Sequence, residues 1–406
     1  MKPNGPIPAG FAADANGHLL IGGRDVNSLV AEAGSTPLFV YDKARIAAQV
    51  ERFRTAFSPA VALHYAVKAN PYAPLLELMA TLVDGFDVAS AGEIERVAGL
   101  GLPVSFAGPG KSDAELVKAI RAGVTINLES EAEADRALGL AEQCSITPIL
   151  AIRVNPPFGL KGAGMKMGGH GSPFGIDHDR VPALIGTLIA AGADWHGLHI
   201  YAGSQALSAD AVIELQRETI ALAASIAEQA GHAPRHVNLG GGFGIPYFAK
   251  DEPLDLERVG SALAKALEER PKILGDTKFA IELGRWLVGE AGVYLTRVVD
   301  RKVSRGRTFL VTDGGLHHML AASGNFGQLL RRNYPVAIAS RFAADPNEEQ
   351  TIVGCLCTPL DLLADEVLLP CAEVGDLVAI FCAGAYGLSA SPVGFLSQPM
   401  AREMLV

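Results

Sequence analysis

The chain of 406 residues has little cysteine, few aromatic side chains and fewer basic than acidic residues, 34 against 44. Its five cysteines are too few, and odd in number, for a disulfide framework, so we expect free thiols in a cytoplasmic protein. The net charge of −10 disfavours nucleic acid and anionic membranes as partners, because both attract basic surfaces. The N-terminus lacks the apolar run of a secretory signal, and the most apolar stretch, 181–195, is too short to span a bilayer.

Short apolar runs alternate with longer amphipathic stretches from about residue 36 onward. This alternation, repeated about eight times, is typical of an α/β protein with a (β/α)₈ TIM barrel, which we predict over residues 36–288. Glycine and polar residues gather where the apolar runs end, and barrel enzymes keep their chemistry at the C-terminal ends of their strands. The predicted strands are 38–42, 61–69, 85–90, 103–109, 124–129, 148–155, 195–203, 236–244 and 278–285.

The pattern changes after roughly residue 290. From there the chain is rich in predicted strands joined by short turns, and it shows little helical periodicity. We therefore predict a second, all-β domain, of a sandwich or barrel-like kind, over residues 289–406. The first residues, 1–35, are expected to belong with it.

Lys68 lies in the segment HYAVKANPY, residues 64–72, at the end of a predicted barrel strand. A lysine in the mouth of a barrel is partly desolvated, so its amine can be neutral and nucleophilic. A lone lysine is more often an ordinary solvated side chain, and the position alone does not decide between the two interpretations.

Three further segments carry features of a site. The glycines of GGGFG, residues 240–244, offer bare backbone N–H groups, as a phosphate cradle needs. Ile245 stands where a dinucleotide fingerprint would require its last glycine, so a dinucleotide site is unsupported. ELGR, residues 282–285, joins a carboxylate to an arginine at a strand end, and GAYG, residues 384–387, places a tyrosine on a tight turn.

Together and in this order, these segments resemble the fold-type-III, alanine-racemase-like decarboxylases that depend on pyridoxal phosphate. That family includes diaminopimelate, ornithine and arginine decarboxylases. The resemblance covers nearly the whole chain from about residue 36, and it implies an amino-acid α-decarboxylase whose cofactor forms a Schiff base with Lys68. The matching segments are HYAVKAN, FDVASAGE (86–93), RVNP, FGI (174–176), GLHIYAGSQ (197–205), GGGFGIPY (240–247), ELGR and GAYG.

The resemblance also assigns roles to single residues. Glu282 would face the pyridine nitrogen and keep it protonated, so that the ring acts as an electron sink. Tyr201 stands where the family commonly has a histidine stacked on the cofactor ring, and an aromatic ring can still stack there. The residues implied to bind pyridoxal 5′-phosphate are Lys68, Asp87, Arg153, Tyr201, Ser204, Gly240, Gly241, Gly242, Glu282, Gly284, Arg285 and Tyr386.

The segment GCLCTPLD, residues 354–361, matches the part of the family that reaches into the active site of a partner subunit. The resemblance therefore implies a homodimer with shared active sites, in which Cys357 is the thiol that handles a proton. Residues implied to contact substrate are Arg285, Thr358, Asp361 and Tyr386.

No metal site is expected. The cysteines, Cys144, Cys355, Cys357, Cys371 and Cys382, show no C-x₂-C spacing of a zinc knuckle. The pair His317–His318 is more in keeping with a turn or the lining of a pocket.

Two departures from the family pattern concern the substrate. Thr358 stands where diaminopimelate decarboxylases have a glutamate that reads the far end of the substrate, and residues 313–336 replace their Arg-Pro segment. A site built to pair charges discriminates strongly when one partner is missing. Within that segment, Arg331 and Arg332 lie a few residues after LAASGNF (320–326) and offer another source of charge.

The segments HIYAGSQ, DGGLHHMLAASGNFGQ and GFLSQP resemble a subgroup found with exosortase and exopolysaccharide systems. The implied substrate is an amino acid, or an aminoacyl group attached to a carrier, for which an acyl carrier protein is the expected partner. Alternatives are a diaminopimelate decarboxylase, disfavoured by Thr358, an alanine racemase, disfavoured by Glu282, and a non-catalytic cofactor-binding protein. The long β domain disfavours the last, because such proteins are typically a lone barrel.

Overall fold

The computed structural model describes residues 1–160, 165–166, 168–169, 171–326, 328 and 330–406. The chain divides into two compact units. The barrel unit comprises Val50–Gly244 and Pro253–Gly284. The sheet unit comprises Met1–Gln49, Ile245–Glu252 and Arg285–Val406.

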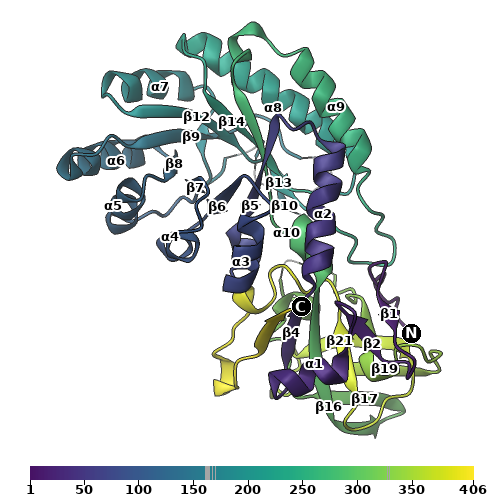
Figure 1. The fold of residues 1–406 in the computed structure, drawn as a ribbon. Coiled ribbons are helices and arrows are strands. Elements are labelled where there is room, and N and C mark those ends of the chain that lie inside the picture. The colour runs from purple at the N-terminus through teal and green to yellow at the C-terminus, as the bar shows by residue number, and fades with distance from the viewer. Residues whose placement is uncertain (161–164, 167, 170, 327, 329) are drawn as a thin grey trace. The chain divides into compact units, whose positions relative to one another are not determined.

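Parallel strands of the barrel unit form a closed ring, because β8 pairs with β9 and β15 pairs with β5 (Figure 1). This confirms the predicted (β/α)₈ barrel. Side chains of these strands are mostly buried, as expected for a parallel sheet that helices cover. The strands of the ring are β5 (Val61–Ala66), β6 (Gly85–Val88), β7 (Val104–Phe106), β8 (Thr125–Leu128), β9 (Ile149–Asn155), β12 (Asp194–Ile200), β14 (His236–Gly241) and β15 (Lys278–Leu283).

Serine residues begin several of the helices that follow these strands. Ser90, Ser112, Ser130 and Ser208 each accept a hydrogen bond from a backbone N–H in the first turn, which fixes where the chain turns from strand to helix. The helices are α2 (Lys43–Ala56, across the boundary of the units), α3 (Ala73–Ala80), α4 (Ala91–Val97), α5 (Asp113–Arg121), α6 (Glu131–Cys144), α7 (Val181–Ala190), α8 (Ala209–Ala230) and α9 (Leu256–Glu268). Shorter elements are η1 (Val67–Ala69), β10 (Met165–Lys166), β11 (Ile176–Asp177), β13 (Gly203–Ser204) and η2 (Lys272–Leu274).

The segment 38–42, predicted as a barrel strand, instead belongs to the sheet unit. It forms β4 (Leu38–Tyr41), which pairs with β16 and with β22. All of its side chains are buried, and a fully apolar run fits the centre of either kind of sheet, so its pattern does not distinguish them. The limits of 36–288 inferred from the sequence therefore differ from those of the barrel unit.

A mixed sheet dominates the sheet unit, and a small antiparallel meander accompanies it. Its core joins Leu38 and Val40 of β4 to Val293 and Leu295 of β16. The strands are β1 (Ala12–Ala13), β2 (Leu19–Ile21), β3 (Arg24–Asp25), β4, β16 (Gly292–Ser304), β17 (Arg307–Thr312), β18 (Val336–Ile338), β19 (Glu348–Val353), β20 (Leu362–Leu369), β21 (Leu377–Ile380) and β22 (Arg402–Leu405). Helical elements are α1 (Val26–Ala33), α10 (Arg285–Val288), η3 (Gly289–Ala291), η4 (Leu320–Ser323), η5 (Ala339–Arg341), η6 (Leu388–Ala390) and η7 (Phe395–Ser397).

The five cysteines all lie in the described residues and are unpaired, as predicted. His317 and His318 are buried, and His318 contacts the carbonyl oxygen of Pro399 through Nε2 at 2.8 Å. Across the described part of the chain, no helix has the length and apolar character needed to cross a membrane.

Candidate active site

Lys68 projects from the C-terminal end of the barrel. Strand β5 ends at Ala66, and the chain then makes the short turn η1, in which Val67 and Ala69 are buried while Lys68 is exposed. The Lys68 Nζ lies 5.6 Å from the centre of the Tyr201 ring, which follows β12. The two residues therefore lie near each other, and their shared role in a cofactor site stays a prediction.

Glu282, on β15, is a buried carboxylate with side-chain partners from β12 and β14. Its Oε2 lies 2.9 Å from His199 Nε2 and accepts a hydrogen bond of 3.2 Å from Asn238 Nδ2. Burial raises the pKa of Glu282, but the charges and hydrogen bonds of His199, Lys68 and Arg153 outweigh it and lower this pKa to about 2. Glu282 is therefore ionised at neutral pH.

The glycine loop after β14 has no room for side chains. A Cβ atom on Gly241 would lie 1.8 Å from the carbonyl oxygen of Glu282, and one on Gly242 would lie 2.1 Å from that of Gly203. Gly240 and Gly242 have φ angles of +68° and +76°, which favour glycine. The loop thus presents bare backbone beside the strand that carries Ser204, as a phosphate cradle requires.

Asp87 and Arg153 are buried at the interior of the barrel unit. Asp87 Oδ2 lies 3.2 Å from His64 Nδ1. Arg153 Nη1 donates a hydrogen bond of 2.8 Å to Glu129 Oε1, which is also buried. Glu129 Oε2 accepts a hydrogen bond of 2.8 Å from the backbone of Gly175, so this carboxylate ties Arg153 to the loop that contains FGI.

Gly284 is the last residue of the barrel unit, and Arg285 begins the last segment of the sheet unit. Arg285 Nη1 donates a hydrogen bond of 2.8 Å to the Tyr247 hydroxyl, and its guanidinium carbon lies 4.7 Å from the centre of the Tyr386 ring. Burial lowers the pKa of Arg285, but Tyr247 and Tyr386 raise it, and the net shift is upward. Its Nε is buried without a hydrogen-bond partner, so a donor remains for an anionic ligand.

The predicted site residues on the loop 354–361 of the sheet unit differ in how exposed their side chains are. Cys357 is exposed and Thr358 is half-buried. Asp361 is buried instead, and its two carboxylate oxygens accept hydrogen bonds from the backbone of Leu316 at 2.6 Å and Leu356 at 2.8 Å. Within one chain, Asp361 therefore braces the loop that carries Cys357, and its predicted contact with substrate stays a prediction.

Comparison with known proteins indicates the kind of reaction that these groups serve. The model of the pyridoxal-binding domain of pyridoxal-dependent decarboxylases matches residues 43–289. The chain belongs to the pyridoxal-dependent decarboxylases. This confirms the predicted family, its cofactor pyridoxal phosphate and its activity as an amino-acid carboxy-lyase.

Curated relatives and a solved structure agree with this family. The L-glutamyl-[BtrI acyl-carrier protein] decarboxylase of Niallia circulans is 38% identical over 91% of this chain and 88% of its own length. The diaminopimelate decarboxylase of Methanothermobacter thermautotrophicus is 32% identical over 96% of this chain and 91% of its own. The structure of diaminopimelate decarboxylase from M. jannaschii with L-lysine superposes with a TM-score of 0.86 and 26% identity, covering 100% of this chain and 94% of that one.

The residues of this chain fit the cofactor of the family. In the barrel unit, an exposed lysine, an ionised buried carboxylate and a glycine loop without side chains occur at the C-terminal ends of strands. These are the groups needed to attach an aldehyde, to face a protonated pyridine nitrogen and to bind a phosphate. In the sheet unit, the unpartnered Nε of Arg285 offers a further donor.

Sequence reasoning missed the residues that hold the named ones in place. His199 and Tyr247 lie inside segments that matched the family, GLHIYAGSQ and GGGFGIPY, and Asn238 lies two residues before the second of them. His199 and Tyr201 are two residues apart, so the alternation of side chains along a strand indicates that both face the same way. This alternation, with a period of two residues, is the feature of the sequence that could have indicated His199 as a neighbour of Tyr201.

Proposed function

We propose that this enzyme removes the α-carboxylate, as CO₂, from an aminoacyl group attached to an acyl carrier protein. The observation that carries the proposal is that Arg331 and Arg332, the other source of charge named above, are both engaged in contacts within the protein. Arg331 donates hydrogen bonds to the carbonyl oxygens of Ser323 at 3.1 Å and Leu362 at 2.8 Å. The guanidinium of Arg332 lies 3.5 Å from the centre of the Phe248 ring.

These contacts bear on free diaminopimelate as an alternative substrate. Its distal end carries an ammonium and a carboxylate, and burying an unpaired charge costs roughly 3–5 kcal/mol. Thr358 offers a hydroxyl without a charge, and both arginines are engaged within the protein. A substrate whose far end is an amide or a thioester avoids this cost. The similarity of 38% to a decarboxylase of a carrier-linked glutamyl group supports the same substrate class.

In the proposed mechanism, the residues of this chain hold the cofactor and move one proton. Bound pyridoxal phosphate supplies an electron sink for the charge left by CO₂. Lys68 would hold the cofactor covalently, and Glu282 would keep the pyridine nitrogen protonated. The glycine loop, Ser204 and Arg285 would bind the phosphate. Cys357 Sγ would then donate the proton that replaces CO₂ on the substrate carbon.

We also propose that the active enzyme is a homodimer, in which Cys357 serves the site of the other subunit. Two large apolar side chains are exposed on the loop of Cys357 and on the loop next to it: Leu360 is 59% exposed and Phe326 is 42% exposed. The two belong to adjoining loops, because Asn325 Nδ2 donates a hydrogen bond of 3.5 Å to the Leu360 carbonyl. Exposed apolar side chains around a thiol are suited to being covered by a second copy. The cytoplasmic location stays a prediction from the sequence.

The test compares CO₂ release by the holoenzyme from carboxyl-labelled substrates. We expect kcat/KM for the L-glutamyl-[BtrI acyl-carrier protein] to exceed that for meso-diaminopimelate and for free L-glutamate by about 10²-fold or more. Thr358→Glu should raise turnover of diaminopimelate by about tenfold, because it supplies one charge, whereas the matched neutral variant Thr358→Gln should not. Efficient turnover of free diaminopimelate by the wild-type enzyme would overturn the proposed substrate class.

A further inference from the structure

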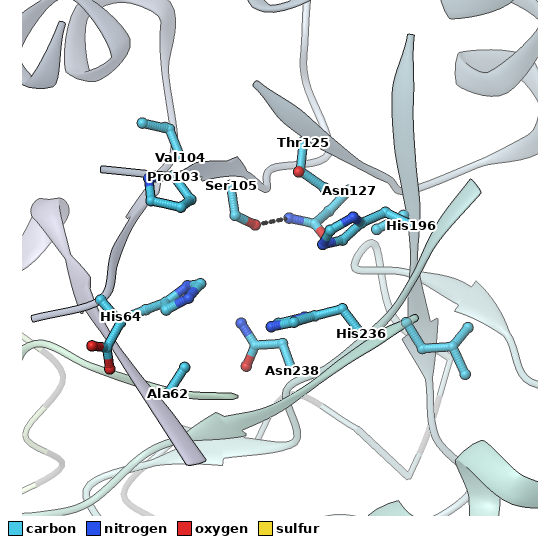
Figure 2. Close-up of a pocket in the computed structure, with 13 residues that line it drawn as sticks. Ala62, His64, Pro103, Val104, Ser105, Thr125, Asn127, His196, His236 and Asn238 are labelled. Atoms are coloured by element: carbon cyan, nitrogen blue, oxygen red, sulfur yellow. Dashed lines mark hydrogen bonds between the residues drawn. The ribbon is translucent and has the colours of Figure 1, made fainter. Parts of the chain in front are cut away.

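The barrel unit contains a cavity at the end opposite to Lys68, where the strands begin. Its volume is about 240 Å³. The interior of a (β/α)₈ barrel is usually packed with branched aliphatic side chains. Here imidazole, amide and hydroxyl groups point into a shared space (Figure 2). These polar lining residues are His64, Ser105, Thr125, Asn127, His196, His236 and Asn238.

Such a cavity is suited to hold water. One water needs roughly 10–15 Å³ of cavity volume and two to four polar partners. A polar cavity of about 240 Å³ therefore accommodates several waters. Asp84 and Pro103 also line the cavity and are exposed, which places its rim at the protein surface. The cavity thus extends from the interior of the barrel toward its outside at this end.

The inner wall of the cavity touches the carboxylates of the proposed active site. His64 Nδ1 lies 3.2 Å from Asp87 Oδ2, and Asn238 Nδ2 lies 3.2 Å from Glu282 Oε2. Asn238 Oδ1 also accepts a hydrogen bond of 2.8 Å from the N–H of Gly240 in the glycine loop. Two residues thus separate cavity solvent from the charged groups near the other end of the barrel.

Acidic groups surround His64 on two neighbouring strands. Burial lowers the pKa of His64, but the carboxylates of Asp87, Glu282 and Asp84 outweigh it and raise this pKa above 6.5. An imidazole also lies beside this side chain in the barrel. His236 of β14 stacks at 5.9 Å between ring centres.

The two other imidazoles of the cavity behave differently from His64. Burial and the neighbouring histidines lower the pKa of His236 to about 3. Burial and Arg235 lower the pKa of His196. Both rings are therefore neutral at pH 7 and act as polar walls, whereas the pKa of His64 is shifted in the opposite direction.

We propose that His64 is a positioning residue for Asp87 and that the cavity is its solvent port. A protonated His64 holds the Asp87 carboxylate in place and exchanges its proton with cavity water, from the end of the barrel opposite to Lys68. Each decarboxylation replaces one carboxylate by one proton, so the reaction consumes a proton from solvent. The catalytic part of this inference rests on the proposed role of Asp87, whereas the port and the pairing rest on geometry alone.

Hydrogen–deuterium exchange at the C2 position of histidine, followed by mass spectrometry of peptides, tests the port without catalysis. The cofactor-free protein is incubated in D₂O across pH 5–9. His232 is exposed and serves as the internal control. We expect His64 to exchange in the folded protein with a midpoint above that of His232. In Asp87→Asn this midpoint should fall by about one pH unit or more, because the opposite charge is lost.

Activity of the holoenzyme then tests the catalytic part. His64→Gln should lower kcat with little change in KM and alter the pH dependence of kcat, whereas His232→Gln should match the wild type. His64→Asn is a second variant if His64→Gln does not fold, with thermal unfolding as the check. A His64 that stays protected while His232 exchanges would show that the cavity is closed and overturn the port. An unchanged midpoint in Asp87→Asn would overturn the pairing.

The remaining outcomes separate this inference from the proposed function. Normal kcat and a normal pH profile in His64→Gln would remove the catalytic part, while the enzyme would still be a decarboxylase. Absence of CO₂ release from every substrate tested would contradict the proposed function, and the exchange experiment would still decide the port.

Discussion

The two units hold their predicted site residues in different ways. In the barrel unit these residues lie on strands or directly after them, and buried partners fix them, as His199 and Asn238 fix Glu282. In the sheet unit, Cys357 lies on an exposed loop that is braced from within by Asp361. A side chain fixed by buried partners is ready to act within one chain. An exposed thiol beside apolar side chains points to a partner that completes its surroundings.

The largest expected effect comes from replacing Lys68, which is exposed among the predicted site residues of the barrel unit. Lys68→Ala should lower kcat by about 10⁴-fold or more, because a covalent attachment point is lost. Borohydride reduction of the wild-type holoenzyme should fix the cofactor on the peptide that contains Lys68, as peptide mass spectrometry would show. Label on another lysine would contradict the assignment, and Lys250→Ala, an exposed lysine of the sheet unit, is the matched control.

The next prediction concerns Glu282, the site residue of the barrel unit that buried partners hold in place. Glu282→Gln should lower kcat by about 10²- to 10³-fold, because a preorganised charge is removed. The pKa of Glu282 falls from 4.5 to about 2 on folding, so its ionised form stabilises the fold above pH 4.5, and this contribution is lost as the pH falls toward 2. Urea unfolding of the cofactor-free protein should therefore depend less on pH across this window in the variant. An identical pH dependence would contradict the buried charge.

A smaller effect is expected from the exposed loop that carries Cys357. Chains with Lys68→Ala and chains with Cys357→Ala should each be nearly inactive alone. After subunit exchange at equal amounts, half of the dimers are mixed and each mixed dimer has one intact site, so about a quarter of the activity should return. Exchange is verified by mass spectrometry of intact dimers. A mixture that stays inactive after verified exchange would place Lys68 and Cys357 in the same subunit's site.

The sequence predicted the barrel and the residues at its strand ends because both follow from local order along the chain. HYAVKAN and ELGR each lie at the end of an apolar run, and a parallel barrel gathers such ends at one side. The segment LFVYD misled the prediction, because an apolar run reports burial and not which sheet is its partner.

Pairings between distant residues lay beyond sequence reasoning. His199 and Glu282 are separated by 83 residues, and only the register of the barrel shows that they meet. The cavity lined by His64, His196 and His236 is a further case, since its residues come from different strands whose inward positions depend on the tilt of the barrel. The hydrogen bond that Asp361 accepts from the backbone of Leu316 likewise joins residues far apart in sequence, and its predicted contact with substrate stays a prediction.

The position of β4 has a consequence for how the polypeptide folds during synthesis. This strand leaves the ribosome early, yet its neighbours β16 and β22 begin at Gly292 and Arg402. At roughly 5–20 residues per second, β22 emerges roughly twenty seconds to a minute later. All residues of the barrel unit are translated before β16, so that unit can form first. The nascent chain must meanwhile keep the apolar side chains of Leu38–Tyr41 from aggregating, which makes this segment a natural point of contact for chaperones.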